Sequence, residues 1–439
     1  TGSFKLPAGK VGQAQNLGAA TVSASYNGLS ASQKTGAVTV KALPEADAPE
    51  VVLPGVVKDM TPINPNTGGE VLETGDVIIV NKDYIETFDG ATLEDWSRPT
   101  NAYFPKGTTD VIKNTVSLGN TKYYLLGCGR RVYASDVATY VENGKITANT
   151  LDNEIVEVNA NHTILKLDST WRIPYNLQLL PQKYRDAPGT PNEQPSYSIN
   201  DYKQTTQYID ITFSYTTKVP AAAPDMSGSP LFSKAEWRDG GNNTVVLRLT
   251  LRQTGQFYGY SVVWDNDGTL QFSFKHPHGI AKNSSATPLK GVRIVVDPGH
   301  GGNSPGTGGT IAGLQEKTLT LTYSNILKRK LQALGATVVM TRTTDVNPDN
   351  PDMSSRTVHA RNNGTDLLLS VHMNGYGKQS AAGCSLHYFN EYSYAVTRSM
   401  TDAMREVESA YTKNYSKDVF TKRSEPCAWS PFFLCRVHD

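Results

Sequence analysis

The sequence predicts a multidomain protein in which N-terminal β-rich modules precede a C-terminal α/β domain. The chain has 439 residues, which is more than one hydrophobic core usually accommodates. Up to about residue 286, apolar and polar residues alternate in short runs separated by Gly, Asn and Pro, a pattern typical of strands. From about residue 290, short apolar runs alternate with segments of helical spacing, which indicates parallel strands joined by helices.

The first two predicted regions are rich in β structure. Residues 1–45 are predicted to form a complete or partial immunoglobulin-like β-sandwich module, because residues 20–26 and 37–40 alternate around the turn pair Asn27-Gly28. A proline-rich linker separates this module from residues 57–286, which are predicted to contain one or two β-rich accessory domains.

The third region, residues 290–439, is predicted to be an α/β domain with a mainly parallel, mixed sheet. Residues 292–296 form a nearly continuous apolar run, as a buried parallel strand does. Apolar residues then keep helical spacing from Leu319 to Leu334, and Gly335 follows where a helix C-cap is expected. The alternation continues to the end of the region, with strands expected at residues 338–340, 367–371 and 386–389 and helices at residues 354–363 and 392–409.

Composition argues against two classes of partner, nucleic acid and membranes. A net charge of +1 gives no sign of the basic face that nucleic acid usually requires. No apolar run approaches the ~20 residues of a transmembrane segment. The chain opens on Thr1 without a signal peptide, so we expect a trimmed or partial form of a secreted or cell-wall-associated protein. The four cysteines include no C-x-x-C pair and fit free thiols as well as disulfides.

Three short motifs carry residues that bind metals. His300 follows the first predicted strand of the α/β domain in a Gly-rich turn, and His372 closes the third strand. Glu316 lies near the start of the helix after the first strand. Ligands of open α/β sheets bind beyond the carboxyl ends of the strands, so we expect the three side chains to meet at one sheet edge.

Two imidazoles and one carboxylate suit a catalytic zinc ion that keeps a fourth position for water. Each residue also has an ordinary structural interpretation when taken alone. Glu316 at a helix start can serve the helix dipole, and a histidine at a strand end is often structural. A Gly-rich turn can cradle phosphate, but no phosphate-loop lysine follows this one. Convergence of the three residues, together with the family resemblance described next, favours the metal.

The same motifs resemble the zinc-dependent N-acetylmuramoyl-L-alanine amidases of the amidase-3 type, which are bacterial cell-wall hydrolases. The likeness covers about residues 290–426. It is carried by Val296-Asp297-Pro298-Gly299-His300-Gly301-Gly302, Leu314-Gln315-Glu316-Lys317, Thr341-Arg342-Thr343-Thr344-Asp345 and Asp366-Leu367-Leu368-Leu369-Ser370-Val371-His372-Met373-Asn374.

The resemblance implies a fold, a cofactor and a reaction. The fold is an α/β sandwich around a mixed sheet, and the zinc ligands are His300, Glu316 and His372. The implied substrate is peptidoglycan, cleaved at the amide between the lactyl group of N-acetylmuramic acid and the L-alanine of the peptide stem. Apart from the resemblance, Arg342 and Asn374 are predicted to contact the substrate. The alternatives are an ordinary exposed arginine and an asparagine with a plain hydrogen-bonding role.

The C-terminal end departs from the family pattern. The family uses a second glutamate after a Cys-Pro-apolar run, as general base and acid. Here Glu425-Pro426-Cys427 is followed by residues 428–439, which place no glutamate at the matching position. No catalytic residue is therefore assigned, and a truncated or altered end would explain the departure. Two alternatives stay open: a catalytically impaired wall-binding protein, and another zinc amidohydrolase on the same scaffold.

Overall fold

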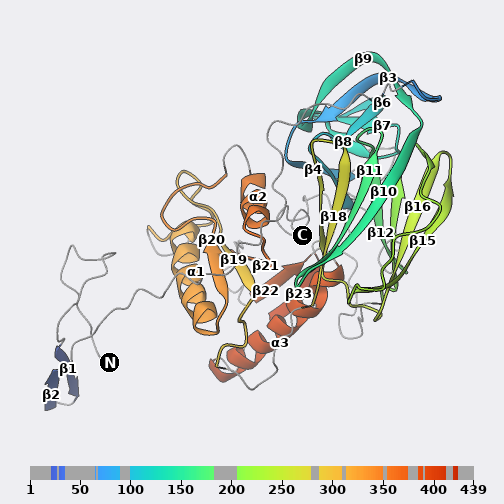
Figure 1. Ribbon diagram of the computed structural model, residues 1–439. Coiled ribbons are helices and arrows are strands. Elements are labelled where there is room, and N and C mark those ends of the chain that lie inside the picture. The colour runs from blue at the N-terminus through green and yellow to red at the C-terminus, as the bar shows by residue number, and fades with distance from the viewer. Residues whose placement is uncertain are drawn as a thin grey trace. The chain divides into compact units, whose positions relative to one another are not determined.

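The computed structural model describes residues 21–26, 29–34, 65, 68–88, 99–181, 205–277, 286–308, 313–349, 353–373, 384–388, 391–411 and 419–423 (Figure 1). The chain divides into two compact units, Thr1–Val51 and Val52–Asp439. In the first unit, β1 (Thr21–Tyr26) pairs antiparallel with β2 (Leu29–Lys34). The second predicted strand, residues 37–40, lies outside the described residues, so the immunoglobulin-like module stays a prediction.

Three sheets make up the β region, which we define as residues 68–277 of the second unit. The seven-stranded sheet has the order β5-β4-β8-β7-β6-β3-β9, the five-stranded sheet β14-β10-β11-β18-β17, and the four-stranded sheet β12-β13-β16-β15. The first contains β3 (Val71–Val80), β4 (Tyr84–Phe88), β5 (Pro99–Pro105), β6 (Thr109–Leu118), β7 (Thr121–Leu126), β8 (Arg131–Tyr133), the 3-10 turn η2 (Ala134–Asp136) and β9 (Val137–Thr147). The second contains β10 (Asn149–Val158), β11 (His162–Ser169), β14 (Thr216–Lys218), β17 (Tyr260–Trp264) and β18 (Thr269–Lys275), and the third β12 (Tyr175–Leu180), β13 (Tyr208–Phe213), β15 (Phe232–Gly241) and β16 (Thr244–Leu251).

One buried cluster draws side chains from all three of these sheets. Val77 of β3, Leu165 of β11 and Ile209 of β13 are each 0% exposed and belong to the same core. Alternation explains this burial: in β16, Leu247, Leu249 and Leu251 point inward while the residues between them are less buried. The β-rich character predicted for this part of the chain is confirmed, and its division into domains stays a prediction.

The α/β region, residues 286–423 as described, contains the parallel strands that were predicted. β19 (Arg293–Pro298) lies between β20 (Thr337–Met340) and β21 (Leu367–Val371), and both pairings are parallel. A second parallel pair joins β22 (Cys384–Tyr388) to β23 (Val419–Arg423). The helices are α1 (Glu316–Ala333), α2 (Ser354–Asn362) and α3 (Tyr394–Tyr411), with a 3-10 turn η4 (Glu391–Ser393).

Helices cover these strands at the predicted positions, but the predicted apolar face of α1 is only partly buried. Leu327 and Leu331 pack on the core, whereas Tyr323, Ile326 and Leu334 are exposed. Helix α1 packs on β19 and β20, and α3 packs on β22 and β23 (Figure 1). Gly335 follows the α1 C-cap at φ +96°, a left-handed conformation that glycine adopts without strain. Among the described helices, none combines the length and apolar character needed to cross a membrane.

Candidate metal centre

Parallel pairing brings the two predicted histidines to one sheet edge. In the register of β19 and β21, Pro298 lies opposite Val371. His300 and His372 follow these paired strand ends by two residues and one residue. Helix α1 begins at Glu316, so the carboxylate extends from the first turn of that helix toward the same edge. The predicted convergence of the three side chains is therefore observed.

The three side-chain tips form one compact group. Glu316 Oε2 lies 3.2 Å from His300 Nε2, and Glu316 Oε1 lies 3.0 Å from His372 Nδ1. The three potential ligand atoms all lie within 4.8 Å of one another. Tetrahedral ligands held at ~2.1 Å from one zinc ion are about 3.4 Å apart, so small side-chain movements suffice for shared coordination. The group can therefore hold a metal ion.

Burial differs across the group. Glu316 is 3% exposed, whereas the His300 and His372 side chains are 27% and 45% exposed. The other ring nitrogen of His300, Nδ1, lies 3.1 Å from Ser304 Oγ, which orients the ring and leaves Nε2 for a metal. The carboxylate is thus the fixed part of the group, and the imidazoles form its solvent-facing side.

The protonation states of Glu316 and His372 suit metal binding. Burial acts to raise the pKa of Glu316, but the backbone N–H groups of Thr307 and Met373 and the two imidazoles outweigh it, so the pKa is lowered. Those N–H groups lie 2.8 Å and 2.7 Å from the carboxylate oxygens. Burial lowers the pKa of His372, despite the opposing attraction of Glu316. Ionised carboxylate and neutral imidazole are the forms that metals require.

The backbone of His300 adopts an uncommon conformation. Its φ is +60°, a left-handed value that costs a non-glycine residue about 1–3 kcal/mol and persists only where neighbouring groups hold it. Gly301 and Ser304 exchange two backbone hydrogen bonds of 3.0 Å and 2.9 Å, which close the turn. Arg356 Nη2 donates to the His300 carbonyl at 3.2 Å. The turn that presents His300 is therefore held from both sides.

A buried ion pair lies beneath this turn. Asp297 is 0% exposed and Arg356 is 3% exposed, and Arg356 Nη1 donates to Asp297 Oδ1 at 2.7 Å. Asp297 also accepts hydrogen bonds from Thr341 Oγ1 and Ser370 Oγ. Asp297 was not among the predicted site residues, although a carboxylate at the end of a buried apolar strand indicates that it requires a partner.

The two predicted substrate contacts have different outcomes. Arg342 is 3% exposed, and its guanidinium donates to the backbone carbonyls of Pro298, Gly299 and Lys317 at 2.9, 2.9 and 2.7 Å. This side chain therefore supports the His300 turn from beneath, and its contact with substrate stays a prediction. Asn374 lies outside the described residues.

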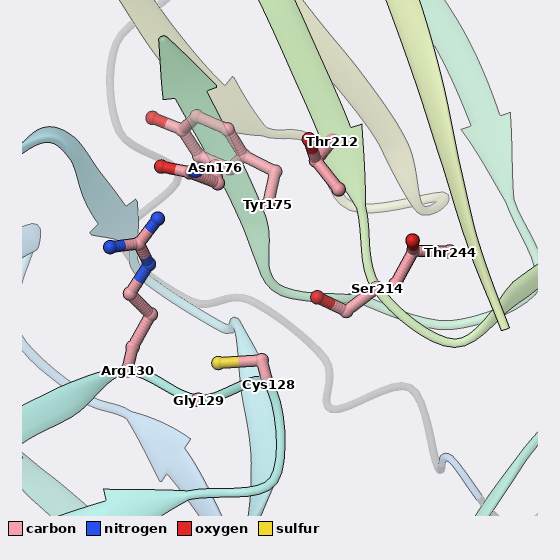
Figure 2. A pocket seen from close by; sticks show the side chains of 8 residues that line it. All are labelled: Cys128, Gly129, Arg130, Tyr175, Asn176, Thr212, Ser214 and Thr244. Carbon is pink, nitrogen blue, oxygen red and sulfur yellow. The ribbon is translucent and has the colours of Figure 1, made fainter. Parts of the chain in front are cut away.

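A cavity of about 280 Å³ lies in the β region, apart from the metal group. It is bounded by the β7–β8 turn at Cys128–Arg130, by Tyr175 and Asn176 of β12, and by the hydroxyl side chains of Thr212, Ser214 and Thr244 (Figure 2). None of the predicted ligands lines it. The predicted chemistry is therefore at the sheet edge and not in this cavity.

Comparison with known proteins agrees with the site. The family model described as N-acetylmuramoyl-L-alanine amidase, Amidase_3, matches residues 294–431. The sporulation-specific N-acetylmuramoyl-L-alanine amidase of Bacillus subtilis is 42% identical over 88 residues, which cover 20% of this chain and 32% of that protein. The probable cell wall amidase LytH of Staphylococcus saprophyticus is 32% identical over 126 residues, which cover 28% of this chain and 40% of that protein.

A third relative is the germination-specific N-acetylmuramoyl-L-alanine amidase of Bacillus subtilis, 32% identical over 140 residues that cover 28% of this chain and 57% of that protein. The chain thus spans less than two thirds of the length of each of these relatives. The family match contains all three members of the His-Glu-His group. Residues 294–431 of this chain are a domain of the N-acetylmuramoyl-L-alanine amidase family, Amidase_3.

Proposed function

We propose that this chain is a zinc-dependent peptidoglycan hydrolase of the cell wall, and that it cleaves the amide between N-acetylmuramic acid and the L-alanine of the peptide stem. One observation carries the proposal: His300, Glu316 and His372 converge within a domain of the amidase family. Two histidines and one carboxylate form the type of ligand set that holds catalytic zinc and leaves a position for water. Cell-wall relatives support a location outside the cell membrane.

The residues of the His-Glu-His group have different roles in the proposed reaction. Zinc, when bound, supplies the Lewis acidity that acidifies a water molecule and polarises the scissile carbonyl. Glu316 is held by two backbone N–H groups and presents a fixed negative charge. The His300 and His372 side chains are 27% and 45% exposed, so solvent reaches both imidazoles. Gly299 lies directly against the His372 ring and leaves room for it.

Metal removal tests the proposal. We expect one zinc per chain by elemental analysis, and release from purified peptidoglycan of peptides that begin with L-alanine, detected by labelling of new amino termini. A chelator should abolish this release and added zinc should restore it. The proposal would be contradicted by a chain that digests the wall equally well without metal, or that opens a different bond.

A second function is favoured by the C-terminal sequence. The family's second glutamate is not found at its place after Cys427. General acid–base assistance is worth ~10²–10⁴-fold in rate, so a chain that lacks it would bind zinc and peptidoglycan but release few peptides. A variant whose terminal segment is completed in the family pattern distinguishes the two functions. A rise of about 10²-fold or more would favour the impaired wall-binding protein, and equal activity would exclude it.

Gly299 should tolerate no side chain. A Cβ at this position would lie 2.4–2.6 Å from three atoms of the His372 ring, so the ring would have to leave its present position. We expect Gly299→Ala to weaken zinc affinity by at least about 10-fold, the lower end of the loss seen when an outer-shell support is removed. Competition titration with a coloured chelator measures this. Gly308→Ala is the matched control, since its Cβ would meet nothing within 4 Å. Equal affinities in the two variants would refute the steric argument.

A further inference from the structure

We propose that Arg361 is a positioning residue for the metal centre: it fixes helix α2 on the β region, and α2 in turn fixes the His300 turn. The inference rests on the proposed zinc site. The β region would then help to position a metal ligand, in addition to any role in attaching the protein to the cell wall. The series of contacts has an outer end at Arg361, which meets the β region, and an inner end at Arg356, which meets the His300 turn. Helix α2 joins the two ends.

The outer end is where α2 meets the β region. Arg361 is 9% exposed, and its Nη2 donates to the Val262 carbonyl of β17 at 2.6 Å. Its guanidinium lies over the ring of Tyr84 at 4.8 Å from the centroid and over that of Tyr103 at 5.6 Å. Cation–π contacts of this kind strengthen when they are desolvated, as here. The Tyr84 hydroxyl also bonds to Thr357 Oγ1, one helical turn away.

The inner end is Arg356, five residues before Arg361 in the helix. A separation of five residues is about 140° around the helix axis, so the two arginines leave α2 on different sides. Arg356 donates from Nε to Asp349 at 2.6 Å, from Nη1 to the Pro298 carbonyl at 3.1 Å, and from Nη2 to the His300 carbonyl at 3.2 Å. The two terminal nitrogens of Arg356 thus end on the strand and turn that present His300, and Nε ends on Asp349.

The left-handed conformation of His300 makes the position of its imidazole depend on this connection. A left-handed histidine relaxes toward ordinary φ values when its carbonyl is released. If α2 moves on the β region, Arg356 cannot keep its contacts with Asp297 and with the His300 carbonyl together. The imidazole then leaves the position in which its Nε2 faces Glu316. Loosening α2 should therefore weaken the metal site without any change in the ligands themselves.

Three variants of the full chain test the proposal. Arg361→Met removes the contact with Val262 and both aromatic contacts, while Tyr84→Phe removes only the hydroxyl that meets Thr357. Lys275→Met is the control: Lys275 Nζ donates to the Thr365 carbonyl at 2.6 Å, so it also joins the β region to the α/β region, but beyond the end of α2. The measurement is the zinc dissociation constant by competition titration, far below the melting temperature of each variant.

We expect Arg361→Met to weaken zinc binding about 10-fold, within the range for outer-shell partners. Tyr84→Phe should act in the same direction by a smaller factor, and Lys275→Met should match the parent. If folded Arg361→Met and Tyr84→Phe both bound zinc as tightly as the parent, the proposed positioning role of Arg361 would be overturned. Equal weakening by Lys275→Met would overturn it too, because the effect would then be general loosening. If Arg361→Met does not fold, Tyr84→Phe decides. Failure of the parent to bind zinc would instead defeat the proposed function itself.

Discussion

Replacement of Glu316 by Gln should remove the proposed zinc ion and lower the proposed amidase activity by at least about 10²-fold, more than the loss of an outer-shell partner costs. The carboxylate is 3% exposed, and each oxygen accepts a backbone N–H group while facing an imidazole. A glutamine amide keeps the size of the side chain but turns one acceptor into a donor, which then opposes the N–H of Thr307 or Met373. The negative charge that complements the metal is lost as well.

Two measurements check this expectation: zinc stoichiometry by elemental analysis, and the rate of peptide release from peptidoglycan. Glu157→Gln is a suitable control, because Glu157 is 50% exposed in a surface ion pair with Lys166 and such pairs contribute little. The control should keep the zinc and activity of the parent. If Glu316→Gln kept one tightly bound zinc per chain, Glu316 would not be a ligand.

Replacement of Arg356 by Met should destabilise the α/β region by about 3–5 kcal/mol, because it leaves the carboxylate of Asp297 buried without its cation. Asp297 is 0% exposed, so water cannot take the place of the guanidinium. The hydroxyls of Thr341 and Ser370 still donate to it, but they carry no charge. Hydrogen exchange of peptides that span β19 and β21 measures the loss locally, since exchange reports the free energy of opening of each segment.

The double variant Asp297→Asn, Arg356→Met separates the charge effect from lost packing. With both charges removed, no unpaired ion remains, and part of the lost protection should return. Slower exchange in the double variant than in Arg356→Met is therefore the expected order. Unchanged protection in Arg356→Met alone would mean that Asp297 does not depend on this partner.

The ligand set could be predicted from sequence because each ligand lies at the boundary of an element. His300 and His372 follow apolar strands, of which β19 is buried and β21 is half-buried, and Glu316 begins the predicted helix. Parallel topology then leaves one sheet edge at which such residues meet. The strands and helices of this region were predictable for the same reason: their periodicity is local to each segment.

The support beneath the site could not be predicted in the same way. Arg342 follows a strand in a polar segment and resembles an exposed arginine, yet the His300 turn folds over it and buries it. Arg356 and Arg361 lie in a helix of low apolar content, and their partners Asp297 and Val262 are 59 and 99 residues away in the chain. Such partners are fixed by the packing of whole segments, which no short sequence pattern encodes. The order of the strands in the β region is unpredictable for the same reason.

The shared register of β19 and β21 sets the distance between the two imidazoles that follow these strands. Neighbouring strands lie ~4.8 Å apart whatever the length of the segments that join them. Insertions in parts of the connections between β19 and β21 that contact neither the His300 turn nor Glu316 would thus leave the histidines at their spacing. One residue inserted within β21 would instead shift His372 by about 3.3 Å and reverse the face of every side chain beyond it.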